Sequence, residues 1–234
     1  MTKKDYVLTC SSSTIDNPPE QNSFLWSCCG NCGNIHDYKD FNEHRSYIKR
    51  LANKPDYDPE IYLNTVNSLD WSSQYQSRGG IIVYTIYKDQ LMFGLGRDTK
   101  THDLTDFGGG CEVNDIDSVT TALREFKEES LDAFGYISKQ DISRMPVMYT
   151  EEMLIILLYL RFDMLSLMTH FDELLETTND GLEVDQIVWL TKDQLFGLVM
   201  TDNISSKLYE KVKNFLLKVM TKYGDFTTHD YMNS

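Results

Sequence analysis

Three carboxylates and one guanidinium stand within six residues of this chain, in the run Arg124-Glu125-Phe126-Lys127-Glu128-Glu129. On a helix, residues three and four apart share a face, so Glu125, Glu128 and Glu129 converge on one side. Grouped carboxylates repel one another unless a cation neutralises them, and hard divalent cations prefer such oxygen ligands. The alternative is a solvated helix face with one pair between Arg124 and Glu128.

A run of three glycines precedes this charged segment. Gly108, Gly109 and Gly110 directly follow Phe107. Such a run permits positive φ and a close approach of the backbone to a ligand. A glycine turn, an acidic loop and a carboxylate-bearing helix together favour an oxygen-rich site for a metal-bound phosphate over a plain surface helix.

These residues resemble the box of the Nudix hydrolases. That box reads glycine, five residues, glutamate, seven residues, then Arg-Glu-apolar-any-Glu-Glu-any-Gly-apolar. Gly109 or Gly110 fills the glycine, and residues 124–129 match the charged centre. The first glutamate is absent, because the count from Gly109 reaches Asp115 and the count from Gly110 reaches Ile116.

The closing part of the box also departs from the family pattern. Leu131-Asp132 replaces the glycine and apolar pair, and the next glycine is Gly135. Residues 131–134 are compatible with a helix, so we expect one extra turn that ends at Gly135. The helix that carries residues 124–129 is expected to start at Asp117 or Ser118, which are both good N-cap residues.

The resemblance implies a hydrolase that cleaves a pyrophosphate bond in a nucleoside-diphosphate-linked substrate with Mg²⁺ or Mn²⁺. The metal ligands that it implies are Glu125, Glu128, Glu129 and a carbonyl of Gly109 or Gly110. Glu128 is a ligand or a base, and Arg124 is expected to hold it through an i,i+4 pair.

Three residues outside the charged centre are further candidates for the site. Glu183 falls where many Nudix members place another metal ligand or a general base; the alternative is a surface carboxylate. Arg97 closes a strand at which the family often carries a substrate-facing basic residue, and a surface arginine is equally compatible. Phe107, beside the glycines, is a candidate for substrate binding.

The elements around the box alternate between strand and helix patterns. Residues 81–87 and 91–97 read as a hairpin, and 147–162 as a strand, a turn and a long buried strand. Residues 181–190 follow an amphipathic segment and resemble the family's late acidic segment ahead of a Trp-containing strand. The final helix is expected over about 205–222. The expected fold is α/β (α+β): a Nudix-type α/β/α sandwich with a mixed central sheet and an N-terminal extension.

The expected domains are an N-terminal extension (1–78) of irregular and short helical segments, a Nudix hydrolase domain (79–223) and a flexible tail (224–234). Four of the five cysteines precede residue 33. Cys29 and Cys32 have the spacing of a zinc knuckle. Residues that could complete a structural Zn²⁺ site are His36 or Cys28, with Cys10 or His44. The alternative, reduced cysteines in a tight turn, is slightly preferred because no second paired motif exists.

The whole chain of 234 residues is acidic, with a net charge of −14. This charge disfavours an extended nucleic-acid groove, although a bound metal can still present one nucleotide or cap. No apolar run is long enough to span a membrane, and no signal-type segment follows the N-terminus. A cytoplasmic protein without a membrane partner is expected.

The glycine run, the paired cysteines and the long extension resemble the Nudix proteins of large cytoplasmic DNA viruses, which would place the protein in the host cytoplasm. Some of those proteins remove the mRNA cap, so the implied alternatives are nucleotide-type small molecules and a capped RNA end that yields 7-methyl-GDP. A different alternative is a catalytically weak Nudix-fold binding module. The oligomeric state does not follow from the sequence.

Overall fold

The structure is a computed structural model that describes residues 25–27, 35–37, 58–71, 76–178, 181–201 and 207–227. Two short strands, β1 (Leu25–Ser27) and β2 (Ile35–Asp37), pair with each other in antiparallel fashion. Cys10, Cys28, Cys29, Cys32 and His44 lie outside the described residues, as does the side chain of His36. The candidate zinc site therefore stays a prediction.

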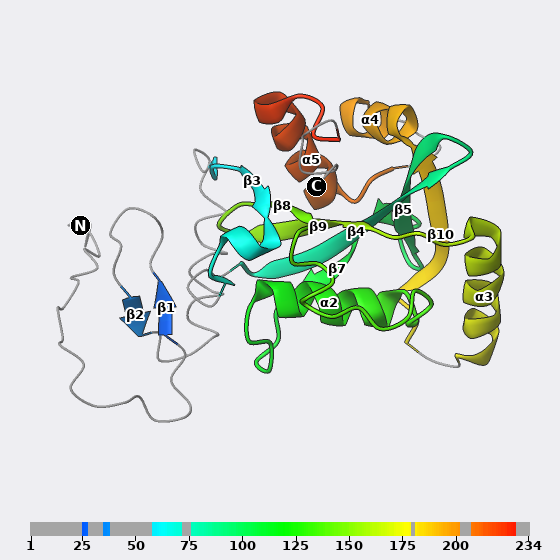
Figure 1. Cartoon of the computed structure of the whole chain (residues 1–234), viewed down its shortest axis with the longest axis horizontal. Helices are drawn as coiled ribbons and strands as arrows, with labels where there is room; N and C mark the ends of the chain where they lie inside the picture. Colours follow the sequence, from blue (N-terminus) through cyan, green and yellow to red (C-terminus); the bar gives the residue numbers. More distant parts are fainter. Residues whose placement is uncertain are drawn as a thin grey trace, which may run out of the picture.

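One mixed sheet forms the centre of the molecule (Figure 1). Its main path runs in the order β10-β5-β4-β9-β8-β3, while β6 pairs with β5 and β7 pairs with β4. The strands are β3 (Tyr62–Thr65), β4 (Arg78–Tyr87), β5 (Gln90–Asp98), β6 (Leu104–Thr105), β7 (Phe107–Gly110), β8 (Pro146–Tyr149), β9 (Met153–Tyr159) and β10 (Val184–Thr191). Strands β4 and β9 run parallel and the other pairs are antiparallel, so the expected mixed sheet is confirmed.

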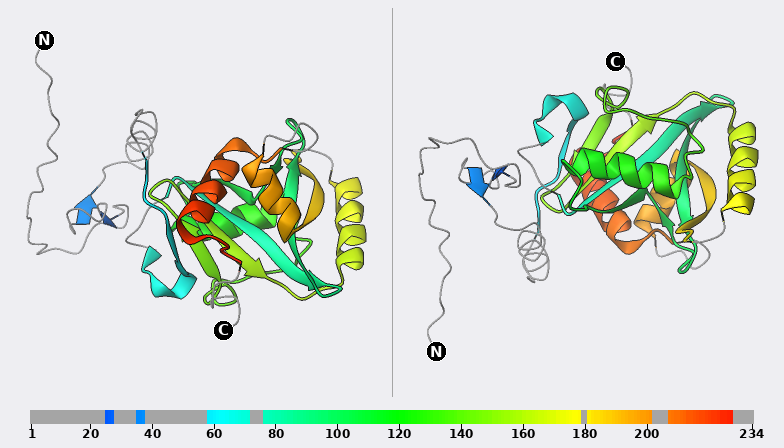
Figure 2. Two further views of the ribbon diagram at one scale, coloured as in Figure 1. Left: turned by 90° about the horizontal axis from the view of Figure 1, so that it is seen from above. Right: turned by 90° about the horizontal axis from the view of Figure 1, so that it is seen from below.

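Helices cover both faces of this sheet (Figure 2). They are α2 (Ser118–Glu129), α3 (Met164–Thr177), α4 (Lys192–Met200) and α5 (Glu210–Tyr223). Helix α2 lies on one face, α4 and α5 lie on the other, and α3 packs beside β10. This arrangement confirms the predicted α/β/α sandwich.

The side chains of β4 point alternately to the two faces of the sheet, which explains why two cores form. Successive side chains of a strand point to opposite faces. Ile81 and Val83 lie in the core beneath α2, whereas Ile82 and Tyr84 lie in the core beneath α4 and α5. The predicted hairpin is also present, and its turn residues Lys88 and Asp89 adopt positive φ.

Two glycines of β4 let the neighbouring segments approach closely. A Cβ on Gly79 would lie 2.3 Å from the carbonyl oxygen of Ser118, at the start of α2. A Cβ on Gly80 would overlap the carboxylate of Asp106. The first turn of α2 and the segment before β7 are therefore fixed against the backbone of one strand, and this contact positions the box.

The start of α2 is confirmed and its expected end is wrong. Asp117 is the N-cap and accepts a hydrogen bond from the Thr120 amide. The helix stops at Glu129, before the extra turn that the sequence predicts. The reason is that Leu131 and Asp132 both adopt positive φ, of 53° and 59°, which ends a right-handed helix. Helix α5 begins at Glu210, later than expected.

Strand β3 complicates the expected division at residue 78. It lies within 58–71 and pairs with β8, so part of the expected extension belongs to the main sheet. The division into 1–78, 79–223 and 224–234 stays a prediction.

Candidate active site

The glycine strand β7 lies between two adjoining hollows. The first has a volume of about 590 Å³ and extends from β7 toward α5, and we call it the α5-side hollow. The second has a volume of about 650 Å³ and extends over the box helix, and we call it the glutamate hollow. Both are lined by Gly109, Gly110, Glu129 and Glu183, so together they form a continuous cleft across the glycine strand.

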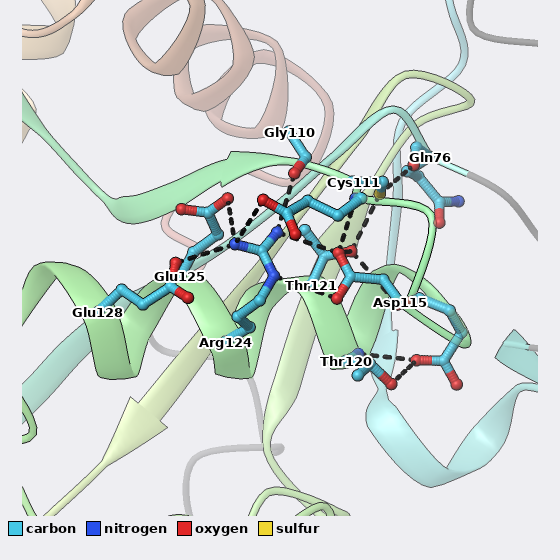
Figure 3. Close-up of polar contacts among 11 residues, drawn as sticks. Gln76, Gly110, Cys111, Asp115, Thr120, Thr121, Arg124, Glu125 and Glu128 are labelled. Carbon is cyan, nitrogen blue, oxygen red and sulfur yellow. Dashed lines mark hydrogen bonds and ion pairs between the residues drawn. The ribbon is translucent and has the colours of Figure 1, made fainter. Parts of the chain in front are cut away.

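Arg124 is the centre of a polar network that joins α2 to the loop before it (Figure 3). Its Nη1 lies 2.9 Å from Glu128 Oε2 and 3.0 Å from Glu125 Oε1. Its Nη2 donates to the carbonyl oxygen of Gly110 at 3.0 Å. The expected i,i+4 pair with Glu128 is therefore confirmed, and the same guanidinium also fixes the end of the glycine strand.

Asp115, the residue that the count from Gly109 reaches, binds Arg124. Its Oδ1 accepts from Arg124 Nε at 3.1 Å and its Oδ2 from Arg124 Nη2 at 3.0 Å. The Glu112 amide and the Thr121 hydroxyl also donate to Oδ2. Burial raises the pKa of Asp115, but these donors outweigh burial and hold the pKa below its usual value of 3.8. The box therefore keeps an ionised carboxylate against Arg124.

The peptide of Gly108 is held on both sides. Its N–H donates to Glu129 Oε2 at 2.7 Å, and its carbonyl oxygen accepts from Arg78 Nη2 at 2.8 Å. Arg78 also forms a two-pronged ion pair with the fully buried Asp106, with both N–O distances at 2.6 Å. Arg78 and Asp106 thus set the position of the backbone that binds Glu129.

Two of the box carboxylates are hard to ionise where they lie. Burial, with repulsion from Asp106, raises the pKa of Glu129 to about 9. Burial also raises the pKa of Glu125, against the opposing effect of Arg124, and the nearby Glu128 and Glu183 add to the rise. A Cβ on Gly109 would fall 2.4 Å from Glu125 Oε1, so this carboxylate packs directly on the glycine backbone.

Glu183 faces the same cleft from the segment before β10. Its backbone carbonyl accepts from the Thr99 amide at 2.9 Å, and the Thr99 hydroxyl donates to the carbonyl oxygen of Leu182. These bonds anchor the segment to the turn after β5. The structure thus brings Glu183 to the hollow that Glu125, Glu128 and Glu129 line.

The donor set suits a hard divalent cation, because carboxylate oxygens line the glutamate hollow and a bound cation would favour the ionised form of Glu125 and Glu129, which burial disfavours. Across the described ranges, however, no three His, Cys, Asp or Glu side chains group as a metal site in their present rotamers. Glu128 and Glu183 are exposed and can reorient toward an ion. The carbonyl oxygen of Gly110 accepts from Arg124, and Gly109 is paired with Gly79 in the sheet.

Two predicted substrate residues lie elsewhere. Phe107 is fully buried and packs edge-on against Phe126, with ring centroids 5.5 Å apart, so its side chain belongs to the core. The prediction of substrate contact by Phe107 is wrong because strand alternation turns its side chain toward α2. Arg97 donates to Asp185 at 2.7 Å and lines neither hollow, which favours the surface alternative.

The end of α2 forms a left-handed cap without a glycine. The Leu131 amide donates to the Glu128 carbonyl and the Asp132 amide to the Lys127 carbonyl, which is the hydrogen-bond pattern of a Schellman cap. Leu131 fills the left-handed position with φ of 53°. The cap therefore places Glu128 and Glu129 on the last turn before a sharp reversal.

Sequence reasoning missed Arg78 and Asp106. They are 28 positions apart and neither belongs to the box. Their signal was local: Arg78 directly precedes the glycines of β4, and Asp106 directly precedes β7. A charged residue beside each of two glycine-containing strands suggests such a pair only once the pairing of those strands is known.

No protein-family model matches this chain, and no curated protein matches it. Its fold is similar to solved structures of low sequence identity. The Ap4A hydrolase of C. elegans shares 14% identity at a TM-score of 0.36, over 64% of this chain and 98% of that one. A MutT/nudix family protein from Enterococcus faecalis shares 13% identity at a TM-score of 0.41, over 81% of this chain and 71% of that one.

The NUDIX domain of Shewanella oneidensis NrtR, solved with ADP ribose, shares 13% identity at a TM-score of 0.37, over 75% of this chain and 97% of that one. Among the residues that the structure describes, no helix combines the length and apolar character needed to cross a bilayer.

Proposed function

We propose that this protein is a metal-dependent hydrolase that cleaves a pyrophosphate bond in a nucleoside-diphosphate-linked substrate. One observation carries the proposal: Glu125, Glu128, Glu129 and Glu183 line a single hollow beside a glycine strand whose backbone is exposed to it. A solvated helix face would leave these carboxylates apart from one another. Here Glu125 and Glu129 are half-buried, Glu129 accepts from the Gly108 amide and Glu125 pairs with Arg124.

The metal would be held chiefly by Glu125 and Glu129, with Glu128 as a further ligand or a base. When bound, Mg²⁺ or Mn²⁺ would neutralise phosphate charge and lower the pKa of a water molecule. The protein's own contribution is placement. Arg124 orients Glu125 and Glu128, while the Gly108 amide orients Glu129.

Glu183 is the remaining candidate for a proton acceptor. It is exposed, it lines the wall of the glutamate hollow that the segment before β10 forms, and its backbone is anchored by Thr99. From that wall it could take a proton from a water that attacks a phosphate lying over the glycine strand. Glu128 is the alternative base, although its carboxylate is bound by Arg124.

Capped RNA is the more specific substrate alternative, with release of 7-methyl-GDP. The net charge of −14 disfavours a long RNA track but does not affect recognition of the cap itself. A non-catalytic binding module is the alternative outside enzymology. The retained network of Asp115, Arg124 and the three box glutamates supports the enzyme over the module, because a module does not require apposed carboxylates.

A substrate screen tests this proposal. The full chain would be incubated with dinucleoside polyphosphates, ADP-ribose, nucleotide sugars, nucleoside triphosphates, diphosphoinositol phosphates and capped RNA, each with Mg²⁺, Mn²⁺ or a chelator. We expect metal-dependent release of a nucleotide from at least one substrate. Cleavage of none of them would favour the binding module, and 7-methyl-GDP from capped RNA alone would select decapping.

A further inference from the structure

Glu183 stands one residue outside the sheet, where the ladder of β10 no longer fixes the chain. Val184 is the first residue of β10 and pairs with Asp98, the last residue of β5. Thr99 continues this contact beyond the ladder. Its amide donates to the Glu183 carbonyl oxygen at 2.9 Å, and its hydroxyl donates to the Leu182 carbonyl oxygen at 3.0 Å. One threonine therefore binds two consecutive peptides of the segment that carries Glu183.

Val184 fixes the other side of Glu183. Its side chain is buried, and a Cβ on Gly96 would fall 2.8 Å from Val184 Cγ2, so the valine packs directly on the backbone of β5. The register between β10 and β5 shifts between Val184 and Gln186, which marks a bulge after the buried valine. Because a bulge interrupts the regular pairing here, the position of Glu183 depends on its two close anchors, Val184 and Thr99.

The turn that carries Thr99 is held in one conformation by hydrogen bonds. The Asp98 carboxylate accepts from the amides of Lys100 and Thr101, at 2.8 Å and 2.7 Å. It also accepts from the Thr101 hydroxyl at 3.1 Å. The Asp98 amide donates to the Asp103 carbonyl oxygen at 2.9 Å, which closes the turn. Thr99 thus reaches the segment before β10 from a fixed position.

The side chain of Glu183, in contrast, is exposed and lines both hollows of the cleft. Where its carboxylate can reach is therefore decided by where its backbone lies. A displacement of about 1 Å in a group that must meet a substrate can lower a rate by about 100-fold. The hydrogen bonds from Thr99 to the backbone of this segment accordingly bear on the chemistry of the cleft.

We propose that Thr99 is a positioning residue, whose hydroxyl holds Glu183 in the place from which it takes a proton from the attacking water. This inference rests on the proposed function, with Glu183 and not Glu128 as the proton acceptor. The proton passes to the Glu183 carboxylate as the water oxygen bonds to phosphorus and the bond to the leaving phosphate oxygen breaks. Thr99 lines neither hollow, so it acts only through the backbone of residues 182–183.

Hydrogen exchange followed by mass spectrometry tests the anchor without any substrate. The full-length wild type and Thr99→Val would be compared with metal chelated; valine keeps the shape of the side chain but lacks the hydroxyl. Peptides that cover residues 181–186 should exchange about 3- to 10-fold faster in Thr99→Val, as expected for the loss of one neutral hydrogen bond. Thr99→Ser keeps a hydroxyl and should exchange like the wild type. Unchanged exchange in Thr99→Val would overturn the anchor.

The rate of pyrophosphate cleavage tests the catalytic consequence. It would be measured with Mg²⁺ and the compound of the screen above that the wild type cleaves fastest. We expect kcat to fall about 10-fold in Thr99→Val while KM stays within about twofold, and Thr99→Ser to recover most of kcat. Thr169→Val is the matched control, because it removes a hydroxyl that binds the Leu165 carbonyl oxygen on the exposed side of α3. It should keep the wild-type rate.

Glu183→Gln separates a positioning role from a general structural one. It removes the proton acceptor and should lower kcat by about 100-fold or more. Adding Thr99→Val to it should have no further effect, because Thr99 acts through Glu183. A further loss of about 10-fold in the double variant, or a Thr99→Val enzyme at the full wild-type rate, would overturn the positioning role. A wild type that cleaves no screened compound is a different failure, since it removes the hydrolase itself and with it the reaction that Thr99 would serve.

Discussion

Asp115 binds Arg124 with both of its carboxylate oxygens, at 3.1 Å to Nε and 3.0 Å to Nη2. Arg124 in turn contacts Glu125, Glu128 and the Gly110 carbonyl. An aspartate therefore fixes the guanidinium on which the candidate metal site depends. The loop between the glycines and α2 brings this side chain within reach.

Replacing Asp115 with asparagine should destabilise the fold, because the variant removes the charge and one acceptor oxygen from a buried ion pair. We expect the free energy of unfolding in urea to fall by about 1.5–3 kcal/mol, as for hydrogen bonds to charged groups. Glu112→Gln is the control, since Glu112 is exposed and 3.9 Å from Arg124. A loss in the control as large as that in Asp115→Asn would contradict this role.

The Arg78–Asp106 pair should behave as a buried unit. Arg78→Met leaves the fully buried Asp106 without its partner and should lower the free energy of unfolding by about 3–5 kcal/mol. The double variant Arg78→Met/Asp106→Asn should lose less than the two single variants together, which a double-mutant cycle measures. Arg97→Met, at the partly exposed pair with Asp185, should lose at most about 1 kcal/mol. Strict additivity in the cycle would count against coupling.

The left-handed Leu131 makes the end of α2 sensitive to side-chain shape. Leu131→Val places a β-branched residue at a φ of 53° and should cost about 1–3 kcal/mol. Leu131→Asn loses more apolar surface but tolerates this conformation. The Leu131→Asn variant should therefore unfold at a higher temperature than the Leu131→Val variant. The opposite order of unfolding temperatures would show that side-chain packing, and not backbone conformation, determines stability at this position.

The stability of the metal-free protein should depend on pH through Glu129. Its pKa is raised from 4.5 to about 9 in the fold, so its stabilising contribution is complete below pH 4.5 and is lost as the pH rises toward 9. With metal chelated, the free energy of unfolding should fall across that window. Glu129→Gln cannot ionise and should show a shallower fall. Parallel curves for the two proteins would contradict the raised pKa.

The periodic elements were predictable from the sequence because their signals are local. The β-branched run of 81–87 and the apolar stripe of α2 each define a face without reference to distant residues. The pair between Arg124 and Glu128 followed from helical spacing alone. These features required only the period of the element to which they belong.

The remaining features depend on tertiary contacts. The joining of Arg78 to Asp106 needs the register in which Gly80 lies opposite Gly108. The end of α2 depends on Leu131 accepting a conformation that leucine rarely adopts. Phe107 could not be assigned to the core without knowing which face of β7 meets α2. None of these relationships leaves a periodic trace in the sequence.

The turnover of Glu129→Gln at saturating Mg²⁺ tests the central claim most directly. The rate of nucleotide release would be compared with the wild type and with Glu176→Gln, an exposed glutamate on α3. The proposed metal site predicts a loss of orders of magnitude in Glu129→Gln, with its thermal unfolding temperature maintained and the control unchanged. A folded Glu129→Gln protein that retains most of the wild-type rate would contradict it.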